Sequence, residues 1–99
     1  MLTNTQKRQL KSLSSTIDTK YQLGKNEITD TLVNMLDKAL TAHELIKVDV
    51  MKNAPSPIME LALDLSAKLN AEIVHTVGRA IVLFRQNKEK DKQKIKLVK

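Results

Sequence analysis

Apolar residues recur at helical spacing in three segments of the chain. The first segment, residues 4–16, is predicted to be a helix because its apolar side chains lie three and then four positions apart. Thr3 and Gln6 have the spacing of a capping box, so this helix is expected to begin directly after Thr3. The predicted apolar stripe consists of Leu10, Leu13 and Ile17.

Two further helices are predicted from their caps. Thr29 is expected to be the N-cap of the second helix. Ser56 is expected to cap the third, with Pro57 at the first helical position, where the missing N–H costs nothing. Asn70 suits the left-handed residue that ends this helix. The expected buried faces are Leu32, Val33, Leu36, Ala39 and Leu40 on the second helix and Leu61, Ala62, Leu65 and Leu69 on the third.

Two strands are predicted between these helices. Residues 45–51 alternate between apolar and charged side chains, the period of a half-buried strand, so Lys47 and Asp49 are expected on its outer face. Residues 21–23 form a shorter strand that is broken by Gly24.

The last two strands are predicted to form a hairpin. Residues 72–77 and 80–85 flank Gly78 and Arg79, which fit a two-residue turn with glycine at its first central position. Residues 81–84 are all apolar and therefore apolar on both faces. A strand of that kind belongs in the middle of a sheet and not at its edge.

The order of elements is therefore α-β-α-β-α-β-β. Right-handed crossovers make the first three strands parallel, and the hairpin makes the last strand antiparallel to the third. The predicted fold class is α/β, of the two-layer α+β type, with a four-stranded mixed sheet.

Positive charge gathers at the two ends of the chain. The net charge of +6 divides into +4 for residues 1–25, −2 for residues 26–85 and +4 for residues 86–99. Residues 87–99 are rich in lysine and poor in apolar residues, so they are expected to form a flexible basic tail outside a domain of residues 1–86. This charge favours nucleic acid or another anionic partner.

Several classes of function lack a sequence signature. The chain has no cysteine, which excludes disulfides, zinc ribbons and thiol nucleophiles, and no GxSxG, HExxH, Walker or GxGxxG motif occurs. His43 and His75 are far apart in sequence and are expected to be structural. We therefore predict no enzyme activity, no metal, no cofactor and no small-molecule substrate. The polar first residues and the lack of a long apolar run favour a cytoplasmic protein without a membrane span.

Gly24 and Lys25 could form an anion site. Glycine allows the backbone to approach a ligand, lysine supplies a cation, and the following helix N-terminus presents free N–H groups. The same pair is common in ordinary turns, so a purely structural role stays open. Because Tyr21 and Phe84 are the only aromatic residues, bases have no stacking platform, and affinity for RNA would have to come from phosphate contacts.

Four segments together resemble the CRM domain family (chloroplast RNA splicing and ribosome maturation) in its bacterial stand-alone, YhbY-like form. They are QKRQLKSL at 6–13, YQLGK at 21–25, AHELIKV at 42–48 and VGRAIVLFR at 77–85. The resemblance covers residues 2–86. It implies an RNA-binding domain whose fold is like the C-terminal domain of translation initiation factor three, with the last strand inside the sheet. It also implies association with ribosomal RNA in precursors of the large ribosomal subunit.

One position departs from the family pattern. The family's loop is Gly-x-x-Gly, whereas here Glu27 stands at the second glycine position, and a glutamate restricts backbone approach and repels phosphate. We therefore expect RNA binding to depend on the first helix and the basic tail as well as on the loop. The first helix is expected to place Lys7, Arg8 and Lys11 along phosphates beside the Gly24–Lys25 loop. Arg79 adds a contact if the hairpin lies on the same side, which the sequence leaves open. The candidate RNA-binding residues are Lys7, Arg8, Lys11, Gly24, Lys25, Asn26 and Arg79.

The predicted function is that of a monomeric RNA-binding protein that assists large-subunit assembly. The alternative is a protein-interaction module whose basic ends only steer the encounter with an acidic partner. The shortage of aromatic residues and the presence of Glu27 keep that alternative open.

Overall fold

The first helix, α1 (Asn4–Ser14), begins with the predicted capping box. The computed structural model describes residues 2–17, 21–25, 28–93 and 95–98 of the chain. The Thr3 hydroxyl oxygen accepts from the Gln6 main-chain N–H at 3.1 Å, and Gln6 Oε1 accepts from the Thr3 N–H at 3.0 Å. Two of the free donors at the helix start are thereby satisfied.

The other two helices also begin and end close to the predicted residues. In α2 (Asp30–His43) the Thr29 hydroxyl caps the Leu32 N–H, as predicted. Asn70 ends α3 (Ile58–Leu69) in the left-handed region, also as predicted. The predicted N-cap Ser56 is wrong by one residue: Pro57 has an extended ψ of 148° and occupies the cap position itself. A proline is tolerated there because the cap residue's own N–H takes no part in the helical hydrogen bonds.

The four strands form one mixed sheet in the order β1-β2-β4-β3. β1 (Tyr21–Leu23) runs parallel to β2 (Leu45–Val50), and β4 (Ala80–Phe84) runs antiparallel to both β2 and β3 (Glu72–Val77). The first three strands thus share one direction, and the prediction that the last strand is central is confirmed. The hairpin turns at Gly78, whose φ of 58° suits glycine.

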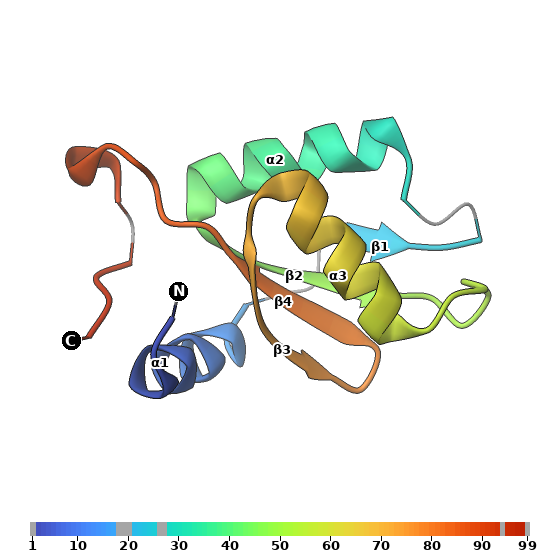
Figure 1. Ribbon diagram of the computed structural model, residues 1–99, viewed down its shortest axis with the longest axis horizontal. Helices are drawn as coiled ribbons and strands as arrows, with labels where there is room; N and C mark the ends of the chain where they lie inside the picture. Colours follow the sequence, from blue (N-terminus) through green and yellow to red (C-terminus); the bar gives the residue numbers. More distant parts are fainter. Residues whose placement is uncertain (1, 18–20, 26–27, 94, 99) are drawn as a thin grey trace.

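Helices cover both faces of the sheet (Figure 1), so the predicted two-layer arrangement is wrong: α1 adds a third layer over the second apolar face of the central strand. α2 and α3 pack on one face around the main core, and all four predicted side chains of α3 are buried there. On α2, Val33 is only partly buried, while its other predicted side chains are in the core. α1 lies on the other face, where Leu10 packs with Val82 and Phe84. Leu13 departs from the predicted stripe: it is 39% exposed, because it borders an open pocket beside the sheet.

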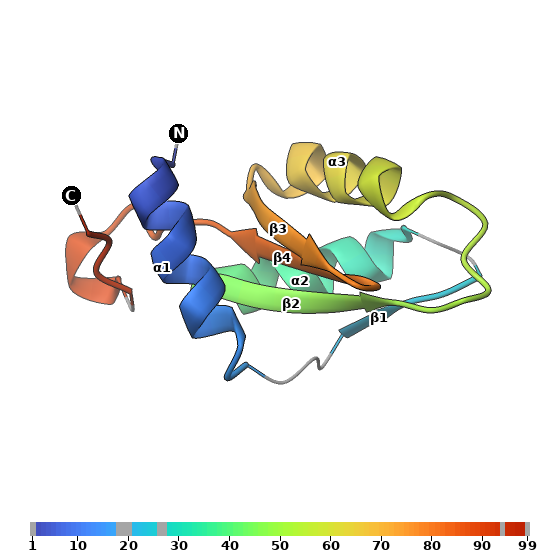
Figure 2. The same ribbon diagram turned by 90° about the horizontal axis from the view of Figure 1, so that it is seen from below.

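Residues 95–98, part of the segment 87–99 that was expected to form a flexible tail, lie against α1 in the structure (Figure 2). The amide of Gln9 donates to the Lys96 carbonyl at 2.8 Å and accepts from the Val98 N–H at 2.9 Å. Ile95 and Leu97 pack against the smaller core cluster under α1. These contacts extend the packed body beyond residue 86.

Arg85 follows β4 and connects this strand to α2 and α3. Its guanidinium donates to the Leu69 carbonyl, to the Thr41 hydroxyl and, at 2.7 Å, to the Asp37 carboxylate. Within the described ranges, no helix is long and apolar enough to cross a membrane.

Candidate nucleic acid interface

The three predicted cations of α1 lie on the side of the helix that does not pack against the core or the C-terminal segment. Leu10 points into the core, and Gln6 and Gln9 hold the C-terminal segment by hydrogen bonds. Lys7 is half-buried, and Arg8 and Lys11 are exposed. The structure therefore brings Lys7, Arg8 and Lys11 together on one accessible side of the helix, as the sequence predicted.

A second source of charge lies on the face of the sheet that α1 covers. Across the strands, Lys47 of β2 pairs with Val82 of β4, and Val82 pairs with His75 of β3. Directly paired residues share a face of a sheet, so Lys47 and His75 flank the buried Val82 on the face that carries α1. We call Lys7, Arg8, Lys11, Lys47 and His75 the helix-1 face.

His75 lies within electrostatic range of Lys11 and Lys47. Burial, and then the positive charges of Lys11 and Lys47, lower the pKa of His75 below its ordinary value of 6.5. Its Nε2 atom is buried and has no hydrogen-bond partner in the part of the chain that the structure describes. At neutral pH the imidazole is therefore uncharged, and the positive charge of the helix-1 face comes from its lysines and arginine.

This pKa shift predicts a pH dependence of stability. As the pH falls below 6.5, the unfolded chain binds a proton at His75 before the folded chain does, so the free energy of unfolding decreases. Urea unfolding measured from about pH 7.5 to about pH 5 should show a smaller decrease for His75→Gln than for the wild type. Equal decreases in the two proteins would contradict this assignment.

The remaining predicted residues lie around the loop that follows β1. Arg79 Nε donates to the Val50 carbonyl at 2.8 Å, and Arg79 Nη2 donates to the Met51 carbonyl at 2.7 Å. Met51 in turn donates its N–H to the Leu23 carbonyl, directly before Gly24. A Cβ atom added at Gly24 would lie 3.4 Å from the Met51 sulfur, an ordinary van der Waals contact, so Met51 lies beside this turn.

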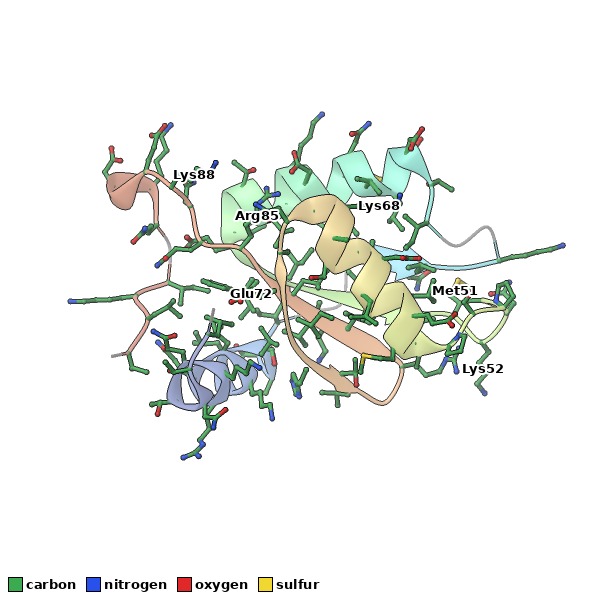
Figure 3. All side chains as sticks on the ribbon, viewed as in Figure 1. Met51, Lys52, Lys68, Glu72, Arg85 and Lys88 are labelled. Carbon is green, nitrogen blue, oxygen red and sulfur yellow. The ribbon has the colours of Figure 1, made fainter. Side chains whose placement is uncertain are left out.

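These contacts place Arg79 and the Gly24–Lys25 turn at the same end of the sheet, a point that the sequence left open. Lys52 also lies at this end and was not predicted; Figure 3 shows it beside Met51. Lys25, Lys52 and Arg79 are exposed, and we call them the loop cations. Asn26 and Glu27, the other two positions of the predicted loop site, lie outside the described residues.

The helix-1 face and the loop cations lie toward opposite ends of the sheet (Figures 1 and 2). The sequence argument placed the cations of the first helix beside the Gly24–Lys25 loop, and the structure does not bring these two groups together. Sequence reasoning also missed Lys47 and His75 as members of a site. The alternation along β2 placed Lys47 on the outer face, but no sequence signal showed that α1 packs on that same face.

Within the described residues, no group of three or more histidine or acidic side chains is arranged to hold a metal ion. The acidic side chain that the fold buries, Glu44, is engaged with the C-terminal segment: it accepts from the Asn87 N–H at 2.6 Å and the Ile95 N–H at 2.8 Å. The geometry therefore offers two groups of cations for binding a polyanion.

The chain is similar to a known domain family and to proteins that are named as RNA-binding. The family model of the CRS1 / YhbY (CRM) domain matches residues 2–85. The "Probable RNA-binding protein YqeI" of Bacillus subtilis is 36% identical over 89 residues, which cover 90% of this chain and 93% of the relative. An "RNA-binding protein" of Haemophilus influenzae is 33% identical over 89 residues, covering 89% of each chain. Neither name indicates a catalytic activity.

A solved structure shares the fold over the whole chain. The solution structure of SAV1595 from Staphylococcus aureus superimposes with a TM-score of 0.82 at 40% sequence identity, covering 99% of this chain and 100% of the other. The similarity therefore continues past the family match and into the C-terminal segment that packs on α1.

Proposed function

The chain belongs to the CRS1/YhbY (CRM) domain family, and from this premise we propose that it binds ribosomal RNA in the cytoplasm and assists maturation of the large ribosomal subunit. Its relatives carry the name of RNA-binding proteins. The ribosomal target is what the family resemblance implies for this chain. We propose that the chain binds this RNA through contacts between its cations and the phosphates.

The observation that carries the proposal is the helix-1 face. Three cations lie on the exposed side of α1, and Lys47 lies on the sheet face that α1 covers, where it and Lys11 both act on His75. The buried acidic side chain of Glu44 is engaged elsewhere. Cations spaced along a helix fit successive phosphates of an RNA backbone. The chain has one tyrosine and one phenylalanine, and Phe84 is buried, so an aromatic sheet surface for stacking several bases is missing.

The loop cations supply a second contact in this proposal. Arg79 uses two of its donors to hold the turn, which keeps the guanidinium fixed beside Met51. Lys25 and Lys52 stay exposed around it. An RNA that follows the sheet from α1 to this end would meet both groups, whereas a short oligonucleotide would meet one.

The proposal is tested by the salt dependence of binding to a fragment of large-subunit ribosomal RNA. With about four phosphate contacts on the helix-1 face, the affinity should fall roughly 100-fold between about 50 and about 200 mM salt. Fluorescence anisotropy of a labelled fragment measures the slope. A fragment long enough to span both groups should give a steeper slope than a short one.

A nuclease experiment separates this function from the alternative of a protein-interaction module. Tagged protein is recovered from lysate with and without nuclease, and we expect ribosomal RNA and ribosomal proteins to be lost together after digestion. Retention of a protein partner after digestion, combined with no salt-dependent binding to purified RNA, would overturn the proposed function.

A further inference from the structure

An open pocket of about 440 Å³ lies where the described part of β1 begins, beside the first half of β2. The end of α1 contributes Leu13, the turn after it contributes Ile17, the end of α2 contributes His43, and β2 contributes Leu45 and Lys47. Its volume is in the range of small-molecule sites, about 300–1,000 Å³. The proposed phosphate contacts leave this pocket unused.

The pocket has apolar walls and a cation. Its aliphatic lining residues come from three separate parts of the chain: α1 and the turn after it, β2, and the C-terminal segment. They are Leu13, Ile17, Leu45, Ile46 and Ile95. Lys47 lines the pocket and also acts electrostatically on His75 across the sheet. The pocket therefore adjoins the helix-1 face and shares one cation with it.

The buried carboxylate of Glu44 builds this pocket. Glu44 lies between two lining residues, His43 and Leu45, and its backbone has a positive φ of 66°. One carboxylate oxygen accepts from the Ile95 N–H and the other from the Asn87 N–H, so the wall formed by Ile95 is fixed to the junction of α2 and β2.

From this arrangement we propose that the pocket binds one unpaired nucleobase of the RNA, with the adjoining phosphate held by Lys47. The faces of a nucleobase are flat and weakly polar, which matches the aliphatic walls, and Tyr21 adds an aromatic side of the pocket. The edge of a base carries donors and acceptors, for which His43 and Thr16 offer polar groups. The phosphate next to that base is an anion, and Lys47 is the cation that the pocket offers it.

The proposal deepens the proposed function and rests on it. It adds a contact that distinguishes unpaired from paired RNA, because a base in a duplex cannot enter a pocket without leaving the stack. The phosphate contacts of the helix-1 face carry no such preference.

The first test uses nucleoside 5′-monophosphates and the full chain, and it does not depend on RNA binding. In two-dimensional NMR titrations we expect a nucleotide to shift the amide signals of Thr16, Lys47 and Ile95, which surround the pocket. Ribose 5-phosphate is the control without a base and should shift fewer of these signals at the same concentration. The absence of shifts with nucleotides, or equal shifts with ribose 5-phosphate, overturns the pocket proposal and leaves the proposed function standing.

The second test blocks the pocket in a matched pair of variants. Thr16 lines the pocket, whereas Ser15 does not; both are exposed, and both hydroxyls donate to the carbonyl three residues earlier. Thr16→Trp should weaken binding of a single-stranded ribosomal RNA fragment by about tenfold while Ser15→Trp leaves it unchanged. Equal affinities in the two variants contradict base binding in the pocket. An absence of RNA binding by the wild-type protein would contradict the proposed function instead.

Discussion

Replacing Lys7, Arg8 and Lys11 together with alanine is expected to weaken binding to ribosomal RNA by about 100-fold near physiological salt. Each cation that neutralises a phosphate of duplex-like RNA releases condensed counterions, so each loss reduces the salt slope by about one unit. The three side chains lie on one side of α1, and we expect the fold to tolerate their loss because Leu10 in the core and the hydrogen bonds of Gln6 and Gln9 anchor this helix. Alanine also preserves helix propensity.

The matched control removes the same charge from other surfaces. Lys38 of α2 and Lys68 of α3 are exposed and lie outside both groups of cations and outside the basic tail; Figure 3 labels Lys68. Lys38→Glu combined with Lys68→Ala lowers the net charge by three, the same change as in the α1 variant. Binding titrations at several salt concentrations should then show a reduced slope for the α1 variant only. Equal losses in the α1 variant and this control would show that net charge alone drives binding, and would contradict the helix-1 face as the site.

Glu44→Ala is expected to lower the free energy of unfolding by about 3 kcal/mol, because it removes the acceptors of two main-chain donors. The Glu44 side chain is 0% exposed, and its oxygens accept from the N–H groups of Asn87 and Ile95. A buried donor without an acceptor costs about 1–3 kcal/mol, since water cannot replace the lost partner there. Backbone strain does not enter, because alanine and glutamate tolerate the φ of 66° about equally badly.

Urea unfolding measures this loss, and amide hydrogen exchange locates it. Exchange should become faster at Asn87 and Ile95, the two donors that lose their acceptor. Glu44→Gln keeps one acceptor oxygen and should fall between alanine and the wild type. Asp64→Ala, at an exposed position of α3, is the control for loss of a carboxylate and should change stability by less than about 0.5 kcal/mol. A loss for Glu44→Ala as small as that of the control would show that the carboxylate does not hold the segment.

Much of the fold could be predicted because its signals are local. The capping box of Thr3 and Gln6 and the left-handed Asn70 each depend on residues within one turn, so the structure confirms them. The apolar run at 81–84 predicted a central strand because both of its faces had to be covered. The prediction that Ser56 is the N-cap was wrong because proline fits both the cap and the first helical position. The ψ of Pro57 distinguishes the two, and the sequence alone does not fix it.

The candidate site could be predicted only in part from the sequence. Lys7, Arg8 and Lys11 could be grouped because they share one helix, and the structure confirms that grouping. Their expected neighbour, the Gly24–Lys25 loop, lies toward the other end of the sheet (Figure 1). Lys47 joins them instead, through the pairing of β2 with β4 and the packing of α1 above it.

By itself, the sequence determined the type, order and buried side of most elements, together with the cations of the first helix. Only the tertiary structure decided which elements share a face, and with it the helix-1 face, the burial of Glu44 and the pocket. The physical reason is that periodicity reports which side of an element avoids water, not what covers that side. Glu44 shows this most clearly: its partners, Asn87 and Ile95, lie 43 and 51 residues away along the chain. No local sequence pattern reports a contact between residues so far apart in the chain.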